Sequence, residues 1–238
     1  MFTTTVAGYD FRVFSFPEKN PDTIKKAYVN TDAESIVLLT PSLTADFSVE
    51  CYNKDGTVRD EIYLPCVAGY DFLLRKRGLP LDTIEFETPR GMITAERDRY
   101  GFCKIRLPKC KQIYTKTIVF FGCNIKFADV FSDVFARVIY CENLELFDRN
   151  TIRALMLKQE PVPSIVVVVS THVGEITLDT YDGHRDGKIP DVLSAIASIY
   201  ALPHLTRMQS SEYAVTSLAD TVLGVDFSGR YLKVRPCR

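Results

Sequence analysis

The sequence has no excess of either charge, and this absence excludes two classes of binding protein. It holds 29 lysine and arginine residues against 30 aspartate and glutamate residues, for a formal net charge of −1. A protein that binds nucleic acid through a basic field needs a positive balance, as does one that binds membranes through a polybasic surface. We therefore expect neither a nucleic-acid partner nor a membrane partner.

Long hydrophobic runs are also missing. Uninterrupted apolar stretches such as 165–169 are far shorter than the roughly 20 residues that a membrane-spanning helix requires. The N-terminal stretch MFTTTVAGYDF has neither the basic region nor the apolar core of a signal peptide. Together these absences predict a cytoplasmic protein.

Metal-binding and redox motifs are absent as well. The seven cysteines form no CxxC pair, and His172, His184 and His204 show neither HxH nor HExxH spacing. A zinc knuckle, a dithiol redox centre and a histidine metal site are therefore not expected, although an all-oxygen metal site stays open. The sequence predicts no cofactor and reduced cysteine thiols.

What is present is an order of strands and helices that occurs twice. Each half has strand-like runs, then a proline-entered helix that is apolar on most sides, then further strands; the helices are predicted at 65–77 and 190–202. An apolar helix of this kind is wrapped by sheet. We therefore expect an α+β protein with two pseudo-symmetric lobes, each a curled, mostly antiparallel sheet around a central helix. The predicted domains are 1–112 and 113–238, and the last strand packs back on the first lobe.

The detailed pattern predicts the individual elements. The predicted strands of the first half cover 2–15 (as a pair), 35–39, 46–52, 61–64, 83–88, 92–97 and 101–107. Those of the second half cover 116–121, 137–140, 165–169, 175–181, 217–225 and 230–234, with an additional helix at 148–158.

The starts of the two central helices carry the titratable side chains of greatest interest. Cys66 follows Pro65, and Asp191 follows Pro190. A helix dipole favours a thiolate or a carboxylate in the first turn. If both helices point into a cleft between the lobes, Cys66 and Asp191 could move a proton across a bound anion. The backbone N–H groups expected to hold that anion belong to Val67, Ala68, Gly69, Val192, Leu193 and Ser194.

Several motifs resemble those of the diaminopimelate epimerase family. Asn53-Lys54-Asp55-Gly56-Thr57, followed by Cys66, is similar to that family's N-x-D-G-S turn and C-G-N cysteine. Residues 6–11 are similar to its G-N-D-F element, residues 121–124 stand at its G-N-P-H, and residues 177–200 are similar to its R-V-W-E-R-G-x-G-E-T-x-A-C-G-T-G-A block. The resemblance implies two lobes, each a sheet around a central helix. It also implies cofactor-independent inversion of an amino acid by two opposed cysteines.

The departures from the family pattern define a divergent member. Asp191 stands at the second catalytic cysteine, and four extra residues separate the Asn53 turn from Cys66. Tyr9 stands at the substrate-binding asparagine, and Asp182 at the first glutamate of the block. The resemblance thus implies Cys66 and Asp191 as catalytic residues, with Tyr9, Asn53, Asn124 and Asp182 in substrate binding. We expect an isomerase of a small amino or carboxylic acid that is not a genuine diaminopimelate epimerase.

Three hypotheses remain open from the sequence. In the first, Asp191 acts as base and Cys66 as acid, or the reverse, in a one-way proton relocation. In the second, the fold has lost its chemistry and binds a small anionic ligand. In the third, it is a scaffold for protein contacts, and Cys66 is a small apolar core residue. A monomer and a homodimer are both compatible with the sequence.

Overall fold

The computed structural model describes residues 2–17, 33–59, 61–78, 82–98, 101–107, 109–120, 123–132, 135–141, 160–172, 175–182, 189–207, 212–217, 223–226, 230–234 and 236–237. The chain forms two compact units. Unit 1 comprises Met1–Arg106 and Lys233–Arg238, and unit 2 comprises Leu107–Leu232. The division therefore lies within strand β15 (Tyr231–Val234).

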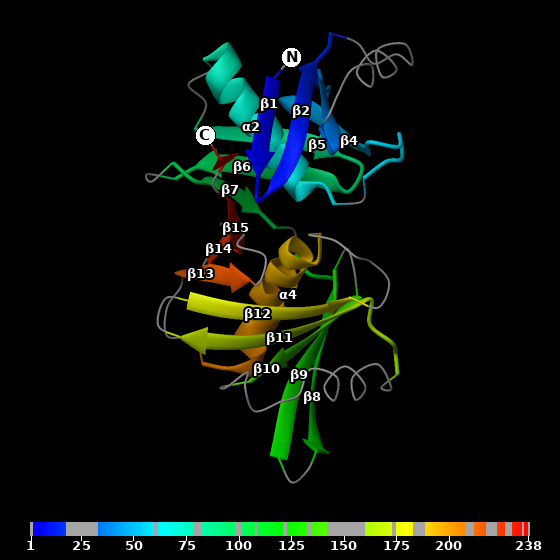
Figure 1. The fold of residues 1–238 in the computed structure, drawn as a ribbon, viewed down its shortest axis with the longest axis vertical. Coiled ribbons are helices and arrows are strands. Elements are labelled where there is room, and N and C mark those ends of the chain that lie inside the picture. The colour runs from blue at the N-terminus through cyan, green and yellow to red at the C-terminus, as the bar shows by residue number, and fades with distance from the viewer. Residues whose placement is uncertain are drawn as a thin grey trace. The chain divides into compact units, whose positions relative to one another are not determined.

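Unit 1 is a sheet packed around one central helix, α2 (Tyr63–Arg77) (Figure 1). Its described strands lie in the order β16-β1-β2-β3-β4-β5-β6-β7. Helix α2 contacts β1, β2, β3, β4, β6, β7 and β16, so the sheet curls around it. The strands are β1 (Phe2–Val6), β2 (Tyr9–Ser15), β3 (Ser35–Thr40), β4 (Phe47–Asn53), β5 (Thr83–Thr88), β6 (Gly91–Arg97), β7 (Cys103–Arg106) and β16 (Pro236–Cys237).

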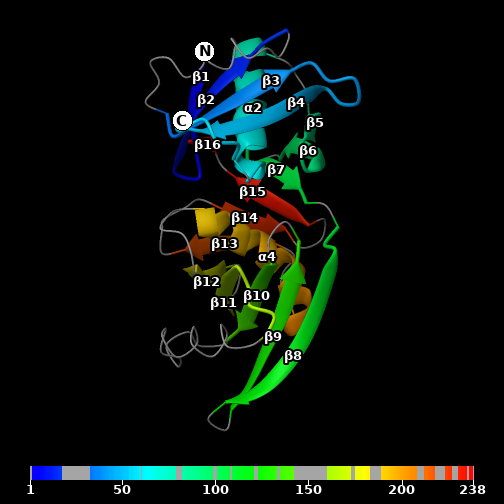
Figure 2. The ribbon, with the colours of Figure 1, turned by 90° about the vertical axis from the view of Figure 1, so that its right-hand side faces the viewer.

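Unit 2 repeats this arrangement around helix α4 (Ile189–Leu205) (Figures 1 and 2). Its described strands lie in the order β14-β13-β12-β11-β10-β9-β8, and α4 contacts β8 to β12 and β14. The strands are β8 (Gln112–Phe120), β9 (Cys123–Phe131), β10 (Phe135–Tyr140), β11 (Ile165–His172), β12 (Glu175–Asp182), β13 (Glu212–Ser217) and β14 (Leu223–Asp226).

The two units share one pairing pattern. In unit 1, β1–β2 and β3–β4 are antiparallel, β2–β3 is parallel, and α2 connects β4 to its parallel neighbour β5. In unit 2, β9–β10 and β11–β12 are antiparallel, β10–β11 is parallel, and α4 connects β12 to its parallel neighbour β13. The predicted α+β fold of two pseudo-symmetric lobes is confirmed.

Helix α2 is enclosed as an apolar core element. Every residue from 63 to 73 is buried, including Asp71, which accepts a hydrogen bond from Thr4 Oγ1 at 2.8 Å and pairs with Arg75. Gly69 lies so close to the sheet that a Cβ atom there would sit 3.1 Å from Leu39 Cδ2. The small residue therefore allows the helix to approach β3 closely.

Two predicted elements differ from the structure, and one long strand of unit 2 was missed. The strand predicted at 61–64 is wrong, because Tyr63 and Leu64 form the first turn of α2. The single strand predicted at 217–225 is wrong too, since β13 ends at Ser217 and β14 begins at Leu223. Strand β9 was not predicted at all. The helix predicted at 148–158 lies outside the described residues. None of the described helices has the length and apolar character needed to cross a membrane.

Candidate functional site

Helix α2 begins earlier than its sequence indicated, and this changes the position of Cys66. The predicted start was Pro65, whereas the first helical residue is Tyr63 and the N-cap is Ile62. The Cys66 N–H donates to the Ile62 carbonyl at 3.1 Å, so Cys66 is the fourth helical residue. Only N–H groups of the first turn lack helical partners. The predicted anion cradle at Val67, Ala68 and Gly69 is therefore wrong, because those N–H groups lie past that turn.

The thiol of Cys66 is fully buried in unit 1. Burial raises its pKa well above the ordinary cysteine value, and the neighbouring Glu61, Cys103 and Cys51 raise it further. This contradicts the expected thiolate, because desolvation of a charged sulfur opposes and exceeds any effect of the helix dipole. At neutral pH, Cys66 is a neutral thiol that can donate a proton but cannot accept one.

Two more buried cysteines lie near Cys66. Burial raises the pKa of Cys51 to about 12 and raises that of Cys103 as well. Across the part of the chain that the structure describes, no set of three or more histidine, cysteine, aspartate or glutamate side chains is arranged to hold a metal ion. These thiols pack as small apolar groups of the core.

A carboxyl group occupies the start of α2, and it belongs to Glu61. Glu61 Oε1 accepts a hydrogen bond from the Leu64 N–H at 2.8 Å, and its other oxygen lies 3.2 Å from Arg59 Nη2. Both side chains are almost fully buried, with exposed fractions of 2% for Glu61 and 4% for Arg59. Desolvation raises the pKa of Glu61, although Arg59 and the N–H groups of Tyr63 and Leu64 act in the opposite direction.

The guanidinium of Arg59 connects this carboxyl group to the sheet. Its Nη1 donates to Ser35 Oγ at 2.9 Å, and its central carbon lies 4.7 Å from the centre of the Tyr9 ring and 5.2 Å from that of Phe11. Tyr9, a predicted substrate-binding residue, thus joins the Arg59–Glu61 pair inside unit 1. Neither Arg59 nor Glu61 was predicted as a site residue, although a charged pair directly before an apolar helix is a visible signal.

The Asn53 turn is closed by its own polar groups. Asn53 donates from its backbone N–H to the Thr57 carbonyl at 2.8 Å and from Nδ2 to Thr57 Oγ1 at 3.1 Å. Asp55 Oδ1 accepts from the Thr57 N–H and hydroxyl, which lowers the pKa of Asp55. Gly56 adopts a φ of +84°, which favours glycine. The described contacts of Asn53 and Asp55 are therefore those of a tight β-turn.

Helix α4 presents Asp191 at a different helical position from that of Cys66. Asp191 is the third residue of α4, whereas Cys66 is the fourth of α2. One residue corresponds to a rotation of about 100° around a helix. Counted from the helix starts, the two residues stand one position apart, and their use as an acid–base pair stays a prediction.

The predicted anion cradle of unit 2 also lies past the first helical turn. Val192 and Ser194 are buried and Leu193 is partly buried. Since α4 starts at Ile189, Leu193 and Ser194 lie where carbonyls four residues earlier accept the N–H groups of a helix. This position does not favour an anion cradle at Val192, Leu193 and Ser194.

The structure separates Asn124 from the start of α4. Asn124 is exposed near the turn of the β8–β9 hairpin, opposite Val119. Two residues further along β9, Lys126 Nζ donates to the carbonyl of Leu205, the last residue of α4. Asp191 lies 14 residues before Leu205, which corresponds to roughly 21 Å along a helix. Asp182, by contrast, is the final residue of β12, the strand that leads into α4.

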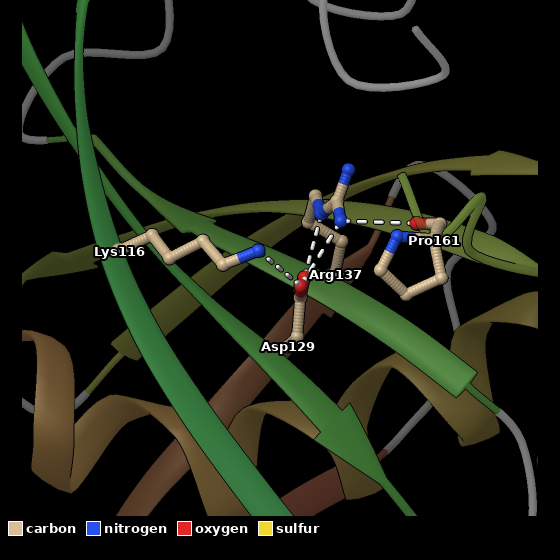
Figure 3. Close-up of polar contacts among 4 residues, drawn as sticks. All are labelled: Lys116, Asp129, Arg137 and Pro161. Carbon is tan, nitrogen blue, oxygen red and sulfur yellow. Dashed lines mark hydrogen bonds and ion pairs between the residues drawn. The ribbon is translucent and has the colours of Figure 1, made fainter. Parts of the chain in front are cut away.

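A buried ion pair in unit 2 was not predicted (Figure 3). Arg137 on β10 is completely buried and donates from Nε and Nη2 to the two carboxylate oxygens of Asp129 on β9, at 2.6 and 3.0 Å. Its Nη2 also donates to the Pro161 carbonyl at 3.1 Å, and Lys116 Nζ lies 3.9 Å from Asp129. The sequence signal was an arginine inside an apolar strand, and its described contacts are structural.

No family model matches the sequence, and no curated protein matches it. Solved structures do match. A PhzC/PhzF phenazine biosynthesis protein from Clostridium difficile matches with a TM-score of 0.67 and 9% identity, over 98% of this chain and 93% of that one. A hydroxyproline epimerase from Agrobacterium vitis, with bound trans-4-OH-L-proline, has a TM-score of 0.56 and 12% identity, over 99% and 89%. Methylitaconate-delta-isomerase has a TM-score of 0.60 and 8% identity, over 99% and 92%. At these identities the likeness establishes the fold alone, which this chain shares with the three proteins.

Proposed function

We propose that this chain is a cofactor-independent isomerase of the epimerase or racemase type, acting on a small amino or carboxylic acid. The observation that carries the proposal is the likeness, over 99% of the chain, to a hydroxyproline epimerase and to methylitaconate-delta-isomerase. A shared fold does not assign chemistry by itself. The proposal therefore also rests on the titratable side chains near the starts of both central helices.

Asp191 is assigned the role of base. It lies in the first turn of α4, where the helix dipole favours the carboxylate form. As a carboxylate it would take a proton from the carbon next to the substrate carboxyl group. A protonated group in unit 1 would return a proton to the resulting carbanion. Cys66 is protonated at neutral pH because burial raises its pKa, and as the acid it would require the core of unit 1 to open to the substrate. Tyr9 and Asp182 are assigned to substrate orientation.

Glu61 is a second candidate for the acid in unit 1. Removal of the four extra residues after the Asn53 turn would move the family's cysteine position from Cys66 to Ile62, the N-cap of α2. Glu61 directly precedes Ile62, and burial raises its pKa. A carboxyl group with a raised pKa is suited to proton transfer near neutral pH.

Proton exchange in D2O tests the proposal. Purified protein is incubated with a panel of amino acids and small hydroxy or unsaturated acids, and proton NMR follows loss of the signal next to the carboxyl group. We expect one class of acid to lose this signal with the wild type and to keep it with Asp191→Asn. The same panel with Cys66→Ser and Glu61→Gln identifies the acid.

Matched variants separate lost chemistry from lost folding. Cys103→Ser alters another fully buried cysteine of unit 1, and Asp55→Asn alters an exposed aspartate in a turn. Both controls should retain the exchange of the wild type. No exchange with any acid of the panel would contradict the proposed function, whereas exchange that survives Asp191→Asn would contradict the role assigned to Asp191.

A second function, binding of a small anion without chemistry, is favoured by a specific observation. Cys66, the catalytic residue predicted in unit 1, is fully buried and uncharged. A thermal shift on addition of a panel acid, without proton exchange, would support this function. Such a shift should grow with the logarithm of ligand concentration once the site is saturated.

A further inference from the structure

Strand β8 forms an open edge of unit 2. Its nine residues pair with β9 from Gln112 to Phe120, and among the described strands of the unit it has a neighbour on one side only (Figure 2). Val119 is 74% exposed and Tyr114 is 47% exposed. A long, β-branched edge strand of this kind presents unpaired backbone groups to any other strand, and proteins usually shorten or charge such edges.

The sequence of β8 reads almost the same in both directions around Lys116. Thr115 and Thr117 flank this lysine, and Tyr114 mirrors Ile118 as a large apolar residue. Ile113 mirrors Val119 as a β-branched residue. In an antiparallel pair of identical strands centred on Lys116, each residue would face its mirror residue, and all these pairs are favourable cross-strand combinations.

We propose that β8 pairs in antiparallel fashion with β8 of a second copy of this chain, with a two-fold axis at Lys116. A two-fold axis requires a self-complementary surface, which the palindromic order of β8 supplies. Main-chain hydrogen bonds between the two edges would join the unit 2 sheets of the copies. The occupant of the edge is thus a second copy, and a strand from an unrelated protein is the competing outcome.

Lys116, at the axis, is the one unfavourable element of the proposed strand pair. Two Lys116 side chains would face each other, and like charges directly opposite destabilise a strand pair. However, Lys116 Nζ lies 3.9 Å from Asp129 Oδ2 on the same chain (Figure 3). That carboxylate already pairs with Arg137, so the repulsion between the lysines is reduced chiefly because each side chain is half-exposed and stays solvated.

Charged residues introduced at Thr115 and Thr117 test this register. Thr115 of one copy faces Thr117 of the other, and both threonines are exposed. We expect the wild type to sediment as a concentration-dependent dimer, while Thr115→Glu/Thr117→Glu and Thr115→Lys/Thr117→Lys each sediment as monomers. An equimolar mixture of the two variants should restore the dimer, because opposite charges then face each other. Restoration also shows that both variants are folded.

Two further measurements fix the site and the axis. Thr83→Glu places the same charge on an exposed residue of β5 and should leave the dimer unchanged. Lys116→Cys should form an intermolecular disulfide under mild oxidation, whereas Val119→Cys should not, because only a residue on the axis meets its own copy. A monomeric wild type, a dimer that both charged variants retain, or a mixture that stays monomeric would overturn the proposal.

Discussion

Arg137 and Asp129 are direct cross-strand partners, and the arginine Nε donates to the carboxylate at 2.6 Å with no exposed surface on the arginine side chain. Strands β9 and β10 are apolar on both sides of this pair, and the Phe127 ring centre lies 5.0 Å from the guanidinium carbon. A one-residue slip between these strands would move one charge to the other face of the sheet. The pair therefore specifies the register of β9 against β10.

Removal of one partner of this pair should strongly destabilise unit 2. Arg137→Met or Asp129→Leu leaves an uncompensated buried charge, and we expect each to lower the free energy of unfolding by about 3–5 kcal/mol. The double variant should be more stable than either single variant. Urea unfolding measures all three, with Lys111→Met as the control, because an exposed side chain outside β8 should change the free energy of unfolding by no more than about 0.5 kcal/mol. Additive losses in the double variant would contradict this expectation.

Glu61 should make stability fall as pH rises. Burial raises its pKa in the folded chain, so the folded state retains a proton that the unfolded chain releases above about pH 4.3. Its contribution is complete below that pH and is lost as pH rises through the raised pKa. Glu61→Gln cannot titrate, and its melting temperature should lack this decline.

Asp55→Asn is the control for these pH measurements, because the pKa of Asp55 is shifted in the opposite direction to that of Glu61. The pKa of Asp55 is lowered by its hydrogen bonds from Thr57, so its contribution is present at neutral pH and is lost as pH falls. The Asp55→Asn profile should differ from the wild type only on the acid side. Parallel profiles for wild type and Glu61→Gln above pH 5 would count against the assignment to Glu61.

Alkylation should label the described cysteines in a fixed order. Cys51, Cys66 and Cys103 are buried and their pKa values are raised, whereas Cys110 is only partly buried. Because the thiolate is the reacting form and needs access to the reagent, iodoacetamide at neutral pH should modify Cys110 before these three. Peptide mass spectrometry over time measures the order, and rapid labelling of Cys66 would contradict its burial.

The hexapeptide Val-Ala-Gly-Tyr-Asp-Phe occurs twice, at residues 6–11 and 67–72. Its two glycines, Gly8 and Gly69, should respond differently to substitution by alanine. Gly8 has a φ of +79°, where alanine is strained, so Gly8→Ala should cost about 1 kcal/mol or more. Gly69 is helical, and the gain of about 1 kcal/mol in helix propensity opposes the close contact of its new Cβ with Leu39. Gly69→Ala should therefore have the smaller effect in chemical unfolding, and equal losses would argue against these conformations.

That hexapeptide, Val-Ala-Gly-Tyr-Asp-Phe, also shows how far the sequence predicts this fold. At residues 6–11 it forms a turn between β1 and β2, and at residues 67–72 it lies inside α2. The flanking patterns predicted both outcomes, because threonines and alternation precede the first copy and a proline-entered apolar run surrounds the second. Such local patterns were also sufficient to predict most of the strands and both central helices.

The site was less predictable because it depends on tertiary burial. The start of α2 moved from Pro65 to Tyr63 because Glu61 caps the helix, an interaction that strand-like alternation at 61–64 concealed. Cys66 is uncharged chiefly because it is buried, with smaller contributions from Glu61, Cys103 and Cys51, and this burial arises only when the sheet folds around α2. Lys126 and Asp129 in β9 likewise obscured a strand whose charged side chains find partners only in the folded unit.

The carboxyl group at the start of α2 has a consequence for ligand recognition. Because Glu61 belongs to the same chain, its effective concentration at the helix end is high. A free carboxylate must therefore compete with Glu61 for the N–H groups at the start of α2. Displacement of Glu61 would also break its buried ion pair with Arg59. Any acid that binds at this helix end must therefore neutralise Arg59 itself, and this selects for anions over neutral molecules of the same shape.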